Sequence, residues 1–203
     1  KWVKDNYEDI RLKISQASWP SLEQTNYFAM GATVELFGKR FEGFNVNISA
    51  EDAITIAIAE SIERAVCLQH FDNTNGFATH TVHELAARNS TFELFERHAF
   101  LYHFYNNKPF YKNARSNSLI KGFHFEKLVE AIRMRGHTVN FFHTDLINKK
   151  TCTVCLITGE GSKNLPFGAI IGMSYSDDLN TSYEKSFFEA ASQYFYKLTS
   201  GCF

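Results

Sequence analysis

AITIAIAESIERAVC, the segment at residues 53–67, is almost entirely apolar but carries two glutamates and an arginine close together, Glu60, Glu63 and Arg64. The same pattern returns within STFELFERHAF as Glu93, Glu96 and Arg97. The residue numbers differ by 33 in every case (93 − 60, 96 − 63 and 97 − 64). Residues at positions i, i+3 and i+4 of a helix share one face. The sequence therefore predicts two apolar helices that each present two carboxylates and one guanidinium on a single face.

The composition is that of an ordinary globular protein. The chain has 203 residues, of which 44% are hydrophobic and 20 are phenylalanine, so it is long enough to bury a large core. No linker rich in proline or glycine interrupts it, and we expect one domain over residues 1–203, with residues 1–20 as an N-terminal extension. The formal net charge of −1 argues against nucleic-acid binding. No apolar run reaches the length of a membrane span.

The cysteines are not arranged as a metal or redox site. Cys152 and Cys155 form a CxxC pattern within TCTVCLIT, a segment that is predicted to be a strand. Residues three apart on a strand point to opposite faces, so a shared metal ion or a redox pair is not favoured. Free thiols fit a reducing compartment, and we expect the protein to be cytoplasmic.

The order of predicted elements indicates an α/β protein of the α+β type. We expect a helix over residues 2–17, a hairpin formed by residues 27–36 and 40–47, and strands over residues 138–142, 151–158 and 167–173. Helices are expected after Ser49, Thr81 and Thr181, each of which has an acidic residue three positions later as in a capping box. An amphipathic helix is expected over residues 123–135.

Hairpin, polar loop and helix recur up to three times along the chain. This recurrence predicts mixed or antiparallel sheets built from hairpin–helix repeats, with the helices packed outside. The alternative is that a hairpin followed by a helix is simply common in α/β proteins and carries no meaning.

The two acidic helix faces predict a chemical role if they meet. Four carboxylates and two arginines would then share one cleft, and the arginines would compensate only half of the negative charge. Mg²⁺ is held by a few carboxylates together with substrate phosphates, and arginine suits phosphate oxygens as a bidentate donor. The pattern therefore predicts a Mg–nucleotide site, built without a P-loop because no GxxxxGK[ST] motif occurs.

Two other interpretations of the acidic helices stay open. Each ExxER motif could be a solvated helix face with an internal ion pair. A di-iron carboxylate site also uses paired glutamates, but it requires Glu-x-x-His, and here arginines follow the glutamates.

These motifs resemble those of the YcaO family. The family pattern S-x-x-x-E-x-x-E-R corresponds here to Ile56, Glu60, Glu63 and Arg64, with isoleucine at the serine position. The family's N-x-N-G loop, which precedes a helix with E-x-x-E-R, corresponds to Asn73-Thr74-Asn75-Gly76 and the second acidic helix. Its downstream R-x-x-x-E motif, often followed by glutamine, corresponds to Lys185, Glu189 and Gln193. Its basic hairpin corresponds either to Gly38-Lys39 or to Gly43, and the resemblance extends from about residue 27 to the end of the chain.

The resemblance implies a YcaO-like fold that binds ATP and Mg²⁺. The implied metal ligands are Glu60, Glu63, Glu93 and Glu96. The implied nucleotide contacts are Lys39, Arg64, Asn73, Asn75, Arg97, Lys185 and Glu189. No protein nucleophile is implied, because phosphoryl transfer depends mostly on positioning and charge neutralisation.

The resemblance also implies a reaction on peptide backbone amides. A nucleophile adds to the carbonyl, ATP phosphorylates the resulting oxyanion, and phosphate leaves. A neighbouring Cys, Ser or Thr side chain gives an azoline, whereas external sulfide gives a thioamide. The implied substrate is a ribosomally made peptide with a leader. The implied protein partner is a leader-binding or sulfur-delivery protein, and the resemblance also allows a homodimer. Neither nucleic acid nor a membrane is expected as a partner.

A non-catalytic YcaO-like protein that binds a peptide or a partner is the alternative. The chain ends at Gly201-Cys202-Phe203 without the proline-rich tail of many cyclodehydratases in the family. We therefore expect a short or truncated member.

Overall fold

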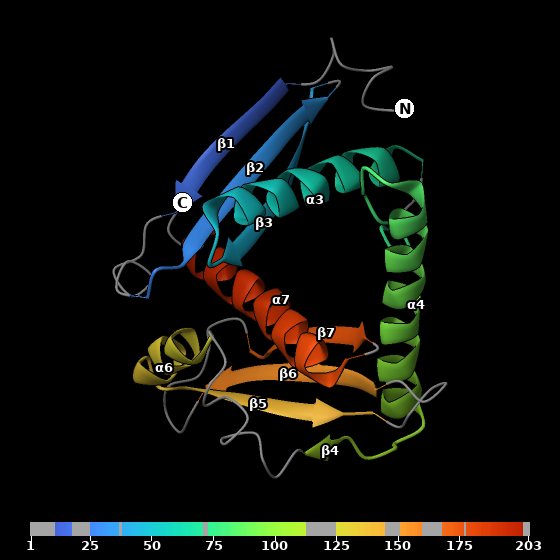
Figure 1. Ribbon diagram of the computed structural model, residues 1–203, viewed down its shortest axis with the longest axis vertical. Coiled ribbons are helices and arrows are strands. Elements are labelled where there is room, and N and C mark those ends of the chain that lie inside the picture. Colours follow the sequence, from blue (N-terminus) through green and yellow to red (C-terminus); the bar gives the residue numbers. More distant parts are fainter. Residues whose placement is uncertain are drawn as a thin grey trace.

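The computed structural model describes residues 11–17, 25–36, 38–70, 73–112, 125–144, 151–159, 168–176 and 178–200. Within these residues the strands form two antiparallel sheets (Figure 1). The three-stranded sheet has the order β1 (Arg11–Ala17), β2 (Phe28–Leu36) and β3 (Lys39–Asn47). The four-stranded sheet has the order β4 (Tyr111–Lys112), β5 (His137–His143), β6 (Thr151–Gly159) and β7 (Ile170–Ser176). The helices are α3 (Ala50–His70), α4 (His83–Tyr105), α6 (Glu126–Met134) and α7 (Leu179–Ser200). The predicted α+β class with antiparallel sheets is confirmed.

The hairpin of β2 and β3 carries α3 on one face. Val34 and Leu36 of β2 and Phe41 of β3 are buried against Ala65 of the helix. Alternate residues of both strands point to the opposite face, as the period of two requires. Ser49 Oγ accepts the backbone N–H of Asp52 at 3.2 Å, so the predicted cap of this helix is confirmed.

Helix α7 lies between the two sheets and joins their cores. One buried cluster takes Val46 from β3 together with residues of β5, β6, β7, α6 and α7. Within it the rings of Phe125 and Phe187 stack with centroids 4.6 Å apart. The single domain that we expect from the sequence requires such a shared core, and its bounds stay a prediction.

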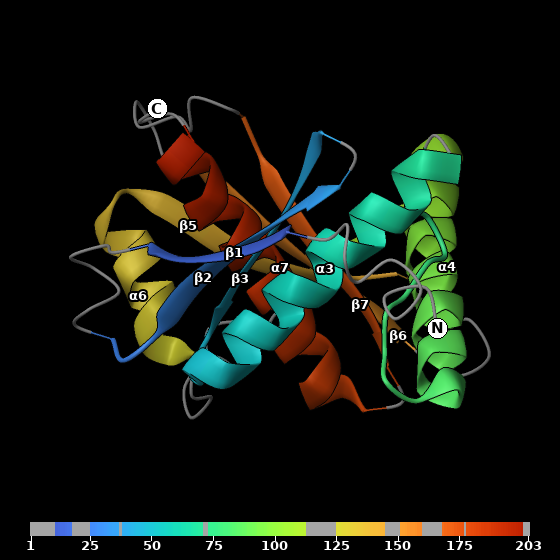
Figure 2. The same ribbon diagram turned by 90° about the horizontal axis from the view of Figure 1, so that it is seen from above.

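Two hairpin–helix units are present and a third is incomplete. β2, β3 and α3 form the first unit, and β6, β7 and α7 form the second. The described segment before α4, residues 73–82, contains turns and no strand. Figure 2 shows α4 at one side of the molecule, and of its described residues only Ala99 and His103 are buried.

The helix that we predict over residues 2–17 is wrong where the structure describes it. Residues 11–17 form β1, which pairs antiparallel with β2 so that Leu12 lies opposite Val34. In RLKISQA the apolar Leu12 and Ile14 alternate with charged residues, which favours a strand. Residues 1–10 lie outside the described part of the chain.

Two of the three predicted caps are also wrong. α4 begins at His83, and its N-cap, Val82, makes no side-chain capping bond, so Thr81 does not cap it. α7 begins at Leu179, two residues before Thr181. Asp178 Oδ2 accepts the Thr181 N–H at 2.7 Å, and this bond lowers the pKa of the Asp178 carboxyl. Asp178, just before the helix, is therefore the capping residue, because a carboxylate at the N-terminus can accept the unpaired N–H groups of the first turn.

Candidate functional site

Residues of α3, α4 and α7 line a cleft of about 980 Å³. Figure 1 shows how these three helices are arranged around the middle of the molecule. Charged side chains from all three helices line the cleft, although α7 lies far from α3 and α4 in the sequence. Among them are seven residues that we predict from the sequence: Glu60, Glu63, Arg64, Glu93, Arg97, Lys185 and Glu189. Ile56, at the position of the family's serine, lines the same cleft.

The two ExxER motifs adopt matching conformations at the cleft wall. Arg64 Nη2 lies 2.5 Å from Glu60 Oε1, and Arg97 Nη2 lies 2.8 Å from Glu93 Oε1. The internal ion pair of the alternative interpretation is therefore present. However, the side chains of Glu60 and Glu93 are only 35% and 23% exposed, and they face a cleft shared by three helices. This arrangement differs from a fully solvated helix face.

Backbone N–H groups hold the same two glutamates from the other side. Glu60 Oε2 accepts the N–H of Phe44 in β3 at 3.0 Å. Glu93 Oε2 accepts the N–H of Gly76, in the loop before α4, at 3.2 Å. Gly76 has a φ of 76°, a conformation that favours glycine. The predicted Asn-rich loop thus contributes through its backbone.

The surroundings of two cleft carboxylates, Glu63 and Glu189, raise their pKa values. Burial, followed by the nearby Glu93, raises the pKa of Glu63 to about 7. Desolvation by the surrounding protein likewise raises the pKa of Glu189 to about 7, although the residue is partly exposed in the open cleft. A bonded N–H from Met173 and the guanidinium of Arg97 oppose the rise at Glu189. A bound divalent cation would remove the repulsion among these groups.

Glu96 lies behind the cleft wall and does not line it. Its Oε1 accepts the N–H of Tyr175 in β7 at 2.8 Å, which ties α4 to the second sheet. Burial raises the pKa of Glu96 to about 8, the nearby Glu189 and Glu93 add to the rise, and the Tyr175 N–H opposes it. Glu96 is thus electrostatically linked to the cleft without facing it in this structure.

Three predicted nucleotide contacts lie at or beyond the rim. Lys39 is exposed at the start of β3, beside the hairpin turn, and does not line the cleft. Asn73 and Asn75 are exposed in the loop before α4, where Asn73 Oδ1 accepts the Asn75 N–H at 3.1 Å. Thr74, between them, does line the cleft.

The donor set fits Mg²⁺ held partly by a ligand. Within the described residues, no three acidic, histidine or cysteine side chains converge as a ready-made metal site. Mg²⁺ prefers oxygen ligands, keeps several waters and is commonly bound by one or two carboxylates plus substrate phosphates. Glu60, Glu63, Glu93 and Glu189 supply such oxygens, and Arg97 and Lys185 supply cations for phosphate.

The three cysteines within the described residues are unsuited to act as nucleophiles. Cys67, Cys152 and Cys155 are free and buried. Cys155 belongs to the core around α7, whereas Cys152 packs with Ala99 and Tyr175, so the CxxC pair is split between two clusters as predicted. Burial and nearby carboxylates raise the pKa of Cys67 to about 11 and that of Cys152 to about 12, so both stay protonated near neutral pH.

Several residues that line the cleft were not predicted from the sequence. Phe44, Phe188 and Tyr196 give one part of the cleft an aromatic lining, and the rings of Phe44 and Tyr196 lie 5.7 Å apart. The residues of α7 that line the cleft recur every three or four positions from Thr181 to Tyr196. Helical spacing from Lys185 and Glu189 would have pointed to Phe188 and Tyr196. No local pattern marks Phe44, which is brought in by β3.

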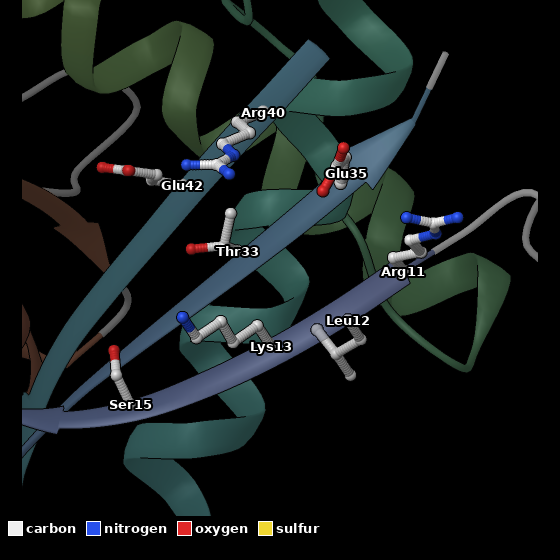
Figure 3. Close-up of a pocket in the computed structure, with 8 residues that line it drawn as sticks. All are labelled: Arg11, Leu12, Lys13, Ser15, Thr33, Glu35, Arg40 and Glu42. Carbon is white, nitrogen blue, oxygen red and sulfur yellow. The ribbon is translucent and has the colours of Figure 1, made fainter. Parts of the chain in front are cut away.

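A second hollow, of about 450 Å³, lies over the three-stranded sheet (Figure 3). It is lined by Arg11, Leu12, Lys13, Ser15, Thr33, Glu35, Arg40 and Glu42. Its β2 and β3 residues alternate with those that pack against α3, so they point to the opposite face of the sheet. None of the predicted site residues lies there.

Comparisons with known proteins agree with the fold. A family model described as YcaO cyclodehydratase, ATP- and Mg²⁺-binding, matches residues 69–199. ATP and Mg²⁺, which we expect from the sequence, are thus the ligands named for the matching family. A search of curated proteins gives no match. No helix of the described residues is long and apolar enough to cross a membrane.

Three solved structures share the fold at low sequence identity. YcaO from Methanopyrus kandleri bound with AMPPCP and Mg²⁺ is 11% identical with a TM-score of 0.66, covering 94% of this chain and 64% of that one. The E. coli microcin synthetase McbBCD complex with pro-MccB17 bound is 12% identical with a TM-score of 0.69, covering 93% and 66%. A heterocyclase in complex with substrate and cofactor is 10% identical with a TM-score of 0.70, covering 94% and 39%. The chain thus spans about two thirds or less of each of these proteins.

Proposed function

Because this chain belongs to the YcaO family, we propose that its three-helix cleft binds ATP with Mg²⁺ and activates peptide backbone amides by phosphorylating the amide oxygen. The observation that carries the proposal is the meeting of carboxylates and cations from α3, α4 and α7 in one cleft. A volume of about 980 Å³ is ample for a nucleotide.

In this proposal the acidic and basic lining residues divide the work of holding the triphosphate. Oxygens of Glu60, Glu63, Glu93 and Glu189 hold the cation. Glu96 supports them by fixing α4 to β7 through its bond with the Tyr175 N–H. Arg97 and Lys185 bind phosphate oxygens. Mg²⁺, when bound, neutralises the negative charge that builds up on the phosphates during transfer.

The reaction needs no covalent intermediate with the protein. A nucleophile bonds to the amide carbon, and the former carbonyl oxygen carries the negative charge. The nucleophile loses its proton to solvent, and the oxygen bonds to the γ-phosphorus as the bond between that phosphorus and ADP breaks. The carbon–oxygen bond then breaks as phosphate leaves. A new double bond forms at the same carbon, either to nitrogen with loss of the amide proton or to sulfur. The raised pKa values of Cys67 and Cys152 support this route, because a protonated buried thiol is a poor nucleophile.

The proposed substrate is a ribosomally made peptide with a leader. A leader-binding or sulfur-delivery protein is the proposed partner, and a second copy of the chain is a further one. The similarity to McbBCD supports this proposal, because that structure is a complex that holds pro-MccB17. An azoline results from a neighbouring Cys, Ser or Thr side chain, and a thioamide results from sulfide.

An isotope experiment tests the proposed chemistry. A candidate peptide that carries heavy oxygen in its backbone carbonyls is incubated with the protein, its partner, ATP and Mg²⁺. We expect the label in the released phosphate and a peptide product that has lost that oxygen. Loss of water from the peptide identifies an azoline, and exchange of oxygen for sulfur identifies a thioamide.

Two outcomes would contradict the proposed reaction. Product formation with unlabelled phosphate would exclude phosphorylation of the amide oxygen. Binding of nucleotide and peptide without any turnover would instead support the non-catalytic alternative.

A further inference from the structure

Two glycines lie where a helix backbone touches a strand backbone. A Cβ atom at Gly43 of β3 would meet the carbonyl oxygen of Ala57 in α3 and lie 2.7 Å from the nitrogen of Ser61. A Cβ atom at Gly172 of β7 would meet the backbone of α7 and lie 2.5 Å from the nitrogen of Ala190. Side chains do not tolerate such short contacts with backbone, so glycine allows each helix to lie this close to its strand.

The residue after each glycine donates its backbone N–H to a glutamate of the packed helix. The N–H of Phe44 donates to Glu60 Oε2 at 3.0 Å, and the N–H of Met173 donates to Glu189 Oε2 at 2.7 Å. Both glutamates line the cleft. The glycine, the N–H donor and the glutamate of the second unit each lie 129 residues after their counterparts in the first unit (172 − 43, 173 − 44 and 189 − 60). The two hairpin–helix units thus place a carboxylate in the same way.

We propose that Gly43 and Gly172 are positioning residues that orient the Glu60 and Glu189 carboxylates for the Mg–nucleotide, an inference that rests on the proposed function. A carboxylate with one oxygen on a strand N–H has few orientations left, so its geometry is set before the ligand binds. At Glu60 the second oxygen pairs with Arg64, which restricts it further. A side chain at either glycine must push the helix away from the strand and lengthen the bond between N–H and carboxylate.

Helix α4 holds its carboxylate differently and serves as an internal comparison. Glu93 accepts the N–H of Gly76 from a loop, and the strand contacts described for α3 and α7 are not involved. Substitutions at Gly43 and Gly172 should therefore leave the contact of Glu93 in place. The loss of nucleotide affinity in a Gly43 variant then reports on α3, and the loss in a Gly172 variant reports on α7.

Calorimetric titration with Mg–AMPPCP tests the proposal on Gly43→Ala and Gly172→Ala in the full chain. We expect each variant to bind roughly 10-fold or more weakly, the size typical when a partner of a metal ligand is lost. Gly31→Ala is the matched control within the same sheet. Its Cβ would come close only to the end of the flexible Ser15 side chain, at 2.9 Å, and its distances of 3.9 Å to Gly43 O and to the Phe44 ring are ordinary contacts that need no backbone shift. The control should bind as the wild type does. Wild-type affinity in folded Gly43→Ala and Gly172→Ala would overturn the proposal.

A second measurement needs neither nucleotide nor the alanine variants. The backbone amide resonances of Phe44 and Met173 are followed by NMR in the ligand-free protein. Glu60→Gln should move the amide signal of Phe44 and leave that of Met173, and Glu189→Gln should do the reverse. Unmoved signals in both variants would overturn the proposal even if the alanine variants fail to fold. If the amides respond but the wild type does not bind Mg–AMPPCP, the proposed function fails while the positioning contacts stand.

Discussion

Glu96 and Glu93 are three residues apart on α4, yet they face different surroundings. Three residues correspond to slightly less than one helical turn. Glu93 reaches the cleft, whereas Glu96 points toward β7 and accepts the N–H of Tyr175. The sequence places both on one side of the helix, but it does not reveal that the second sheet covers part of that side. A carboxylate that faces a cleft and one that is bound to a neighbouring sheet have the same pattern in the sequence.

The desolvation of the half-buried Glu96 predicts a pH dependence of stability. Its pKa is raised to about 8, so the folded chain binds a proton that the unfolded chain has released above its ordinary pKa of 4.5. The contribution of Glu96 to the free energy of unfolding is therefore fully present below about pH 4.5, and it is lost as the pH rises through about 8. Glu63, with a pKa raised to about 7, adds a contribution of the same sign.

Glu96→Gln should remove much of this loss, because glutamine stays neutral and can still accept the Tyr175 N–H. We expect the ligand-free variant to be more stable than the wild type at pH 8 by about 2 kcal/mol, or ~4–8 °C in melting temperature, with little difference at pH 5. Thermal unfolding followed by circular dichroism measures both values. Glu84→Gln, on the exposed first turn of the same helix, is the control and should not reproduce the gain. A variant destabilised equally at both pH values would show that the carboxylate of Glu96 is not desolvated.

Among the elements, those with strong local signals were predicted best. The β2–β3 hairpin, β5 and β6 lie within one or two residues of the predicted ranges, and α3 begins directly after Ser49 as predicted. Their alternation or helical period coincides with turn and cap residues, so the local and tertiary preferences agree. The Trp2–Ala17 helix failed because pairing with β2 decides the conformation of residues 11–17.

Helix caps illustrate the difference between a pattern and a contact. Ser49 and Thr81 have the same capping-box pattern, but only Ser49 makes the capping bond in the structure. Ser49→Ala should therefore lower the free energy of unfolding by about 1 kcal/mol, and Thr81→Ala should change it by much less. Denaturation by urea of both variants measures the difference. Equal losses would contradict the cap assignment.

At the scale of the whole molecule, the cleft depends on how three helices meet. Helical spacing within each motif predicts which residues share a face, and seven of the predicted site residues do line one cleft. It does not predict that the tip of the hairpin, with Lys39, lies away from that cleft. It also misses the aromatic lining by Phe44, because the packing of β3 against α3 and α7 brings that residue in. Contacts between distant segments decide these positions, and a single sequence carries no local record of them.

Calorimetric titration with Mg–AMPPCP tests the central claim, that carboxylates of three helices hold a Mg–nucleotide. We expect the wild type to bind, and we expect this binding to disappear when Mg²⁺ is chelated. Folded Glu93→Ala and Glu96→Ala should show no measurable binding. The first variant loses a carboxylate of the cleft, and the second loses the bond that fixes α4 to β7. Unchanged affinity in both variants, or wild-type binding that is independent of Mg²⁺, would contradict the account.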